Sequence, residues 1–263
     1  MTSSDQPILL WGMLIAVFVF MAAAEWFRPR RNLTVNKARR WVTHALFFVT
    51  NSIVGRLLAF VIAIPTAAYW SNANSFGLFH WIAGPWWVEA LALFVLLDFA
   101  VWFQHLAMHK VPLLWRMHMV HHVDCDLDVS TAVRFHPFEL IVSTLYKSAW
   151  VAVLGAPVAI ALAFEAWLNA NALFNHSNVG LPRWLDQAIR TFLVTPDMHL
   201  VHHSRLPSEQ HQNYGFALTL WDRVFGTYAK DSVLGREGQA IGLSEMSDDR
   251  TVQLGWSLKL PLT

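Results

Sequence analysis

Residues 7–24, "PILLWGMLIAVFVFMAAA", carry no charged side chain. A stretch of this length is close to the roughly 20 apolar residues that a membrane-spanning helix needs. Only 14% of the 263 residues are charged and 55% are hydrophobic, whereas a soluble domain has about 25% charged residues. The sequence therefore predicts an all-α integral membrane protein, because a helix satisfies its own backbone hydrogen bonds in lipid.

Three further apolar regions follow along the chain. Residues 42–69 form one region, which is interrupted by Asn51 and Arg56, and residues 86–105 form the next. The last, 138–174, is broken near its middle by "LGAP" at 154–157. Gly and Pro mark turns, so we expect a helical hairpin whose arms of roughly 16–17 residues are each about 25 Å long.

Charged residues set the expected orientation. The segment 25–41 holds six cations, which the positive-inside rule places in the cytoplasm, with the N-terminus outside as a retained anchor. Residues 71–85 contain no Lys or Arg, as expected of an outer loop. From His176 onward the chain is more polar, which indicates a histidine-rich helical cap on the cytoplasmic side. We expect one domain over residues 1–263, with N-terminal spans in 1–85, in the inner membrane of a bacterial cell.

Eight histidines fall in three groups with helical spacing. HxxxH occurs at 105–109, HxxHH at 118–122, and HxxHH again at 199–203. Offsets of three and four residues place side chains on one helical face. Imidazole suits iron, copper, zinc and nickel, and eight donors exceed the four positions of a structural zinc site. The pattern predicts a site for two metal ions, with ligands His105, His109, His118, His121, His122, His199, His202 and His203.

Two carboxylates in apolar regions allow alternative interpretations. Asp98 precedes His105 by two helical turns, so we expect it to accept a hydrogen bond from a ligand ring. The alternative is a structural ion pair with Arg56. Glu165 either lines a cavity or pairs with Lys147.

Lone histidines at the edges of the fourth apolar region extend the candidate set. His136 in "RFHPFE" and His176 in "LFNHSN" lie on the expected metal side. A lone histidine is often a structural hydrogen-bonding residue, but both are included here as metal-ligand candidates. His211 in "EQHQNYG" can be either.

These motifs together resemble the fatty acid hydroxylase/sterol desaturase superfamily. The resemblance covers about residues 90–230 and rests on the order of HxxxH, HxxHH, "RFHPFE", "NHSN", "TPDMHLVHH", "NYG" and "WDRVFGTY". One departure is Leu106, where the first motif often has Arg. The resemblance implies a membrane-bound non-haem di-iron oxygenase with its active site on the cytoplasmic side. It carries the ligand role over to the eight clustered histidines and to His136 and His176, and it places an acidic residue at Asp98.

The implied reaction is hydroxylation of a lipid C–H bond by O₂, with the chain entering through an apolar tunnel. Desaturation on the same site, a metal transporter and a haem-binding electron carrier are the alternatives. Cys125 is the only cysteine, and there is no GxGxxG or CxxCH motif, so a separate ferredoxin or cytochrome must supply electrons. The net charge of +1 and the absence of a basic run argue against nucleic-acid binding.

Overall fold

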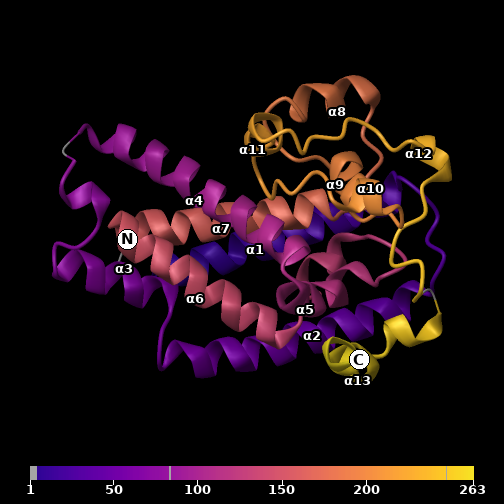
Figure 1. Ribbon diagram of the computed structural model, residues 1–263, viewed down its shortest axis with the longest axis horizontal. Coiled ribbons are helices and arrows are strands. Elements are labelled where there is room, and N and C mark those ends of the chain that lie inside the picture. Colours follow the sequence, from indigo (N-terminus) through magenta and orange to yellow (C-terminus); the bar gives the residue numbers. More distant parts are fainter. Residues whose placement is uncertain (1–4, 83, 247) are drawn as a thin grey trace.

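A computed structural model describes residues 5–82, 84–246 and 248–263, so Ala83 of the expected outer loop lies outside the described residues. Over these residues the chain is helical, and the only β-pairing consists of isolated bridges. The predicted all-α class is confirmed. A bundle runs along the long axis (Figure 1) and comprises α1 (Asp5–Phe27), α2 (Lys37–Ala59), α3 (Ile64–Ala73), η1 (Leu78–His80), α4 (Trp86–Lys110), α6 (Pro137–Leu154) and α7 (Val158–Asn175).

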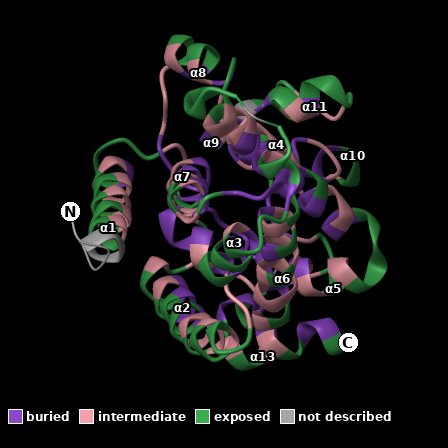
Figure 2. Ribbon diagram, turned by 90° about the vertical axis from the view of Figure 1, so that its left-hand side faces the viewer, coloured by how far each residue is buried: buried purple, intermediate pink, exposed green. Residues whose placement is uncertain are grey.

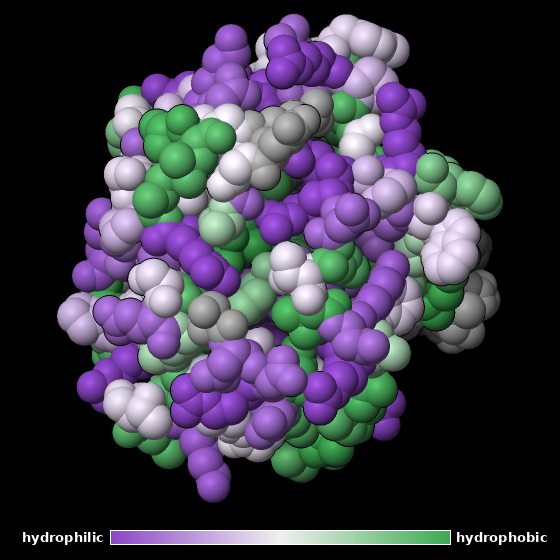
Figure 3. All heavy atoms as spheres, turned by 90° about the vertical axis from the view of Figure 1, so that its right-hand side faces the viewer, coloured by the Kyte–Doolittle hydropathy of each residue, from purple (hydrophilic) through white to green (hydrophobic). Residues whose placement is uncertain are grey.

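Shorter helices form a cap at the end of the bundle opposite α3 (Figure 1). They are α5 (Pro112–His122), η2 (Val129–Val133), α8 (Arg183–Ile189), α9 (Pro196–His202), α10 (Pro207–Gln210), α11 (Leu220–Val224), α12 (Gly235–Gly238), η3 (Asp249–Val252), α13 (Leu254–Lys259) and η4 (Leu260–Leu262). Hydrophilic side chains cover much of the cap end (Figure 3), as expected for a part in contact with water.

Four segments are long and apolar enough to cross a membrane: Leu9–Phe27, Lys37–His80, Trp86–Lys110 and Val158–Asn175. Exposed residues follow the outer faces of α1 and α2 (Figure 2), and they include Val19, Phe20 and Ile53. Such faces are stable against lipid rather than water. Arg56 lies in the last turn of α2, at the end away from the cap, where a long cationic side chain reaches the membrane interface.

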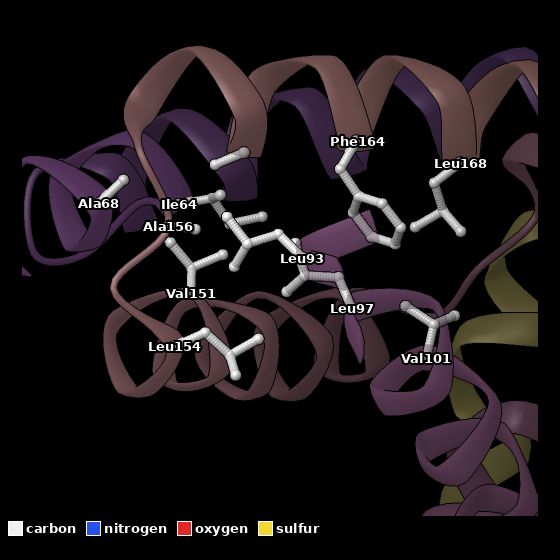
Figure 4. Packing of buried hydrophobic residues seen from close by; sticks show 11 residues of the cluster. Ile64, Ala68, Leu93, Leu97, Val101, Val151, Leu154, Ala156, Phe164 and Leu168 are labelled. Carbon is white, nitrogen blue, oxygen red and sulfur yellow. The ribbon is translucent and has the colours of Figure 1, made fainter. Parts of the chain in front are cut away.

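The predicted hairpin is present as α6 and α7. Gly155 ends α6 with φ 75°, and a Cβ there would lie 2.9 Å from the His80 ring, so glycine is required at this turn. Lys147 Nζ donates to Glu165 Oε2 at 2.8 Å across the two arms. Figure 4 shows the shared core, in which residues of α4 pack between α6 and α7 and against α3: Ile64, Ala68, Leu93, Leu97, Val101, Val151, Leu154, Ala156, Ala161, Phe164 and Leu168.

The basic segment after α1 is bound to the cap rather than free in solvent. Arg40, fully buried, donates from Nε and Nη2 to the two oxygens of Asp124, at 3.0 and 2.8 Å. Its Nη1 also pairs with Asp128. Burial alone would raise the pKa of Asp124, but the Arg40 guanidinium holds it well below its usual range. This cluster joins the start of α2 to the loop that follows α5.

Replacing Arg40 with Met should destabilise the protein severely, because the buried carboxylates of Asp124 and Asp128 would lose the guanidinium that is hydrogen-bonded to both. We expect a loss of about 3 to 5 kcal/mol in the free energy of unfolding. Denaturant unfolding in detergent, followed by circular dichroism, measures it. Arg39→Met is the matched control, since Arg39 pairs with Asp249 at the surface and should cost less than about 1 kcal/mol. Equal losses in the two variants would contradict this assignment.

Candidate metal centre

Nine buried histidines meet where the cap joins the bundle. They come from α4, α5, the end of α7 and α9, and they form two groups in which the ligand atoms lie within 4.8 Å of one another. The first group is His105, His109, His118, His122 and His202, and the second is His121, His176, His199 and His203. The structure therefore brings together all eight histidines of the three spaced motifs, and His176 with them.

Local sequence explains why these short helices form. Pro112 and Pro196 occupy the first helical position of α5 and α9, where a residue without an N–H loses no hydrogen bond. The Thr195 side chain caps α9 by accepting from Met198 N. Within each helix the offsets of three and four residues then direct the rings of each motif to one side.

Backbone and carboxylate acceptors fix the protonation of five rings. His105 Nδ1 donates to Tyr214 O at 2.8 Å, and His118 Nδ1 donates to Glu139 Oε1 at 2.7 Å. The remaining three acceptors are Arg134 O for His121, Ala172 O for His176 and Gln212 O for His202. A carbonyl or carboxylate oxygen can only accept, so Nδ1 carries the proton and Nε2 keeps its lone pair.

The free lone pairs point at one another. His105 Nε2 lies 3.1 Å from His118 Nε2, and His121 Nε2 lies 3.0 Å from His176 Nε2. Two acceptors cannot hydrogen-bond to each other, so these contacts are unfavourable unless a cation lies among them. Both nitrogens of His109 and of His122 are also buried without a partner. The residues present therefore fit a group of metal ions bound by neutral imidazole.

The two groups adjoin. The rings of His122 and His203, one from each group, stack with centroids 4.3 Å apart, and those of His118 and His121 are 5.4 Å apart. Nine donors are more than one transition-metal ion accepts. The arrangement can hold two ions side by side.

Glu139 and Asp222 support the centre and were not singled out from sequence. Glu139, in the first turn of α6, orients His118. The Asp222 carboxylate accepts from the backbone N–H groups of Tyr214 and Gly215 at 2.9 and 2.7 Å, and so holds the loop whose carbonyl orients His105. Gly215 is required there, because a Cβ would lie 2.7 Å from Leu218 O. Both acidic residues lie inside quoted motifs, "RFHPFE" and "WDRVFGTY", which was the available signal.

The structure places two of the predicted site residues away from the ligand nitrogens of the histidine groups. His136 lies outside both groups, because its Nδ1 accepts from Phe138 N and its Nε2 donates to Leu258 O. Within the described residues, Asp98 forms no hydrogen bond with a ligand ring and no ion pair with Arg56. It accepts from Trp221 Nε1 at 3.0 Å and from Leu218 N, and so fastens α11 to α4. His211 lies beside the first group, with its ring 5.8 Å from that of His109, but is not a member.

Residues 90–227, more than half of the chain, match the family model for fatty acid hydroxylase. The chain, a helical bundle with membrane-spanning segments and a polyhistidine centre, therefore belongs to the fatty acid hydroxylase family. No solved structure gives a significant match to the chain.

Similar curated proteins include lipid-modifying oxygenases. The chain is 27% identical over 198 residues to alkylglycerol monooxygenase of Homo sapiens, covering 72% of this chain and 41% of that protein. Against alkylglycerol monooxygenase of Danio rerio the identity is 31%, covering 59% and 34%. Ornithine lipid hydroxylase OlsE of Rhizobium tropici is 32% identical, covering 51% and 40%. The aligned region thus spans about two fifths or less of these relatives.

Burial disfavours the charged form of several clustered imidazoles. Desolvation lowers the pKa of His121, His122, His199 and His203 well below the usual value. The pKa of His176 falls to about 4 and that of His202 to about 3, again through burial. The lone pairs that a metal needs are therefore available at neutral pH.

The metal-free protein should lose stability as the pH falls from 6.5 to 4. In that range the unfolded chain takes up protons on histidines whose usual pKa is 6.5, whereas folded His176 stays neutral down to about 4. Each such group changes the free energy of unfolding by up to about 1.4 kcal/mol per pH unit. Thermal unfolding of apoprotein at several pH values measures this, and His202→Asn should flatten the dependence. A pH-independent midpoint over this range would be inconsistent with buried neutral rings.

Proposed function

We propose that this protein is a membrane-bound di-iron oxygenase that hydroxylates a C–H bond of a lipid. The observation that carries the proposal is the pair of adjoining histidine groups with convergent, unprotonated nitrogens. The names of the similar proteins, alkylglycerol monooxygenase and ornithine lipid hydroxylase, support a lipid substrate. The membrane-spanning helices beside the centre support it too.

The chemistry needs more than side chains can supply. An unactivated C–H bond resists general acid–base attack, and bound iron provides activation of O₂ for this step. The overall reaction converts C–H, O₂, two electrons and two protons into C–OH and H₂O. The nine rings of both groups would hold the ions. Glu139 keeps the proton of His118 on Nδ1, so that Nε2 stays available, and the burial of both groups limits access of bulk water.

The cap is proposed to face the cytoplasm. The arginine-rich segment after α1 lies at the cap end, where Arg30 pairs with Asp197 and Arg40 with Asp124, and cationic loops favour the cytoplasmic side. In a bacterial cell this would be the inner membrane. Because these pairs tie the N-terminal spans to the cap, we treat residues 1–263 as one functional domain. A separate ferredoxin or small cytochrome supplies the electrons.

Two other functions fit the geometry less well. A transporter needs ligands spaced along a path through the bilayer, whereas both histidine groups lie at one end of the bundle. A haem carrier needs room for a porphyrin between two axial rings. Here the rings of neighbouring histidines within the two groups pack with centroids 4.2 to 5.6 Å apart, which leaves no such gap.

Loss of one ligand from either group should reduce bound iron. We expect His122→Ala and His199→Ala each to lower the iron content of purified protein to about half, because each variant disables one group. Metal analysis of protein purified from iron-supplemented cells provides the readout. His136→Ala is the control and should retain full iron, since that ring is hydrogen-bonded to the backbone. Unchanged iron in both ligand variants would overturn the ligand assignment.

Cells that produce the protein should contain a lipid with one extra oxygen atom. Comparative mass spectrometry of lipids from cells with and without the protein tests this, and His122→Ala should abolish the new species. In vitro turnover should require an added electron donor besides NAD(P)H. A product that lacks two hydrogens and contains no new oxygen would identify a desaturase instead.

A further inference from the structure

A large apolar cavity lies among α1, α2 and α7, beneath η2. Its volume is about 790 Å³. Aliphatic and aromatic side chains form most of its wall, including Leu14, Phe18, Phe48, Phe135, Leu162 and Leu173. A wall of this kind binds hydrocarbon rather than polar molecules.

One end of the cavity lies near the second histidine group, although the described lining includes no histidine of that group. Phe135, in its wall, stacks on the His121 ring with centroids 4.7 Å apart and planes at 15°. Ala172, also in the wall, accepts the Nδ1–H of His176 through its carbonyl oxygen. A molecule at this end of the cavity is therefore next to the centre, separated from His121 by the Phe135 ring and from His176 by the Ala172 backbone.

The cavity extends from the centre toward the middle of the bundle. Along α7 its lining residues run from Leu173, beside His176, back to Leu162, a distance of about 16 Å at 1.5 Å per residue. Its long axis thus follows the helices. Trp11 and Ile15 of α1 and Phe48 of α2 line it and are also exposed, so it opens toward lipid near α1 and α2, the two helices with exposed outer faces in Figure 2.

The described part of its wall offers no free charge for a polar group. Glu165 is the only carboxylate among the described lining residues, and both of its oxygens accept from Lys147 Nζ, at 2.9 and 2.8 Å. The other polar side chains in the described lining, such as Asn51 and Ser130, are neutral. A charged head group deep in the cavity would therefore lack a free countercharge, which is costly in a mostly apolar site.

We propose that this cavity holds one hydrocarbon chain of a lipid from the leaflet next to the cap, and that the carbon presented to the centre lies near the head-group end of that chain. The proposal rests on the function proposed above. The head group stays at the membrane surface beside the cap, and the tail runs down past Ala166 toward Leu162. Carbons close to the head group then lie beside Phe135.

Much of the wall comes from outside the segment that matches the family. Residues of α1 and α2 precede residue 90, where the match begins. The N-terminal spans, rather than the histidine motifs, would therefore select the chain that is admitted.

Photo-crosslinking of the metal-free, full-length protein in lipid nanodiscs tests the orientation without turnover. The probes are two phosphatidylcholines, with a diazirine beside the ester carbonyl or beside the terminal methyl group of one chain. We expect the first probe to label the segment around Phe135 and the second to label α7 around Leu162. Preferential labelling around Phe135 by the terminal-methyl probe would overturn the proposal.

Two tryptophan substitutions, one inside the cavity and one outside it, provide the matched control. Ala45 lines the cavity on α2, and Ala16 is exposed on α1 but does not line it. Ala45→Trp should reduce labelling around Phe135 about tenfold, as expected when a large side chain occupies a binding volume. Ala16→Trp should leave it unchanged. Retained iron content in both variants shows that the fold is intact, and equal labelling in the two variants would count against the cavity.

The position of the new oxygen separates this proposal from the proposed function. Fragmentation mass spectrometry of the hydroxylated lipid should place the oxygen near the head-group end of the chain. Oxygen near the terminal methyl would refute the orientation while leaving hydroxylation intact. The expected labelling pattern with no oxygenated product in any lipid would support the cavity and refute the hydroxylase function.

Discussion

Mutual repulsion among imidazole lone pairs is the constraint on which the rest of this structure depends. Carbonyl and carboxylate acceptors hold the protons on Nδ1, which forces Nε2 atoms of different helices to face each other at about 3 Å. Such a site is stable only under one of two conditions. Either cations bind the Nε2 lone pairs, or the surrounding structure is rigid enough to keep the rings in place despite their repulsion. The helices α4, α5, α7 and α9 can meet here because the framework around them is fixed by other interactions.

Buried ion pairs and hydrogen bonds from side chains to the backbone supply that framework. Arg40 joins α2 to the loop after α5, and Asp222 holds the loop that carries Tyr214. Glu25, at the end of α1, accepts from Val129 N and Asn178 N, and so connects η2 to the residues after His176. The polar contacts around the centre thus come from all parts of the chain, including the N-terminal spans. The apolar cavity described above is bounded by those same spans.

Patterns with a short period were visible in the sequence, and contacts between distant residues were not. Apolar runs located the spans, "LGAP" located the hairpin, and the spacing of the three histidine motifs located eight of the nine clustered rings. His136 looked equivalent to His176, because sequence does not show that backbone groups at Phe138 and Leu258 engage both nitrogens of His136. Asp98 shares a helical face with His105, but its carboxylate accepts a hydrogen bond from Trp221 of α11 instead. Carbonyl oxygens, which orient four of the rings, carry no sequence signature.

The Arg40 cluster has a consequence for biogenesis. Arg40 emerges from the ribosome well before Asp124 and Asp128, with which it forms its buried pairs. Until those carboxylates have been synthesised, Arg40 has no buried partner and must remain hydrated at the membrane surface. Helix α2 can dock fully only after the loop beyond α5 has been translated, and His121 and His122 of α5 arrive with that loop. Docking of α2 can thus precede completion of the histidine centre, because His176, His199, His202 and His203 are translated later still. A nascent chain that stalls before residue 124 has neither the partners of Arg40 nor the complete set of clustered histidines.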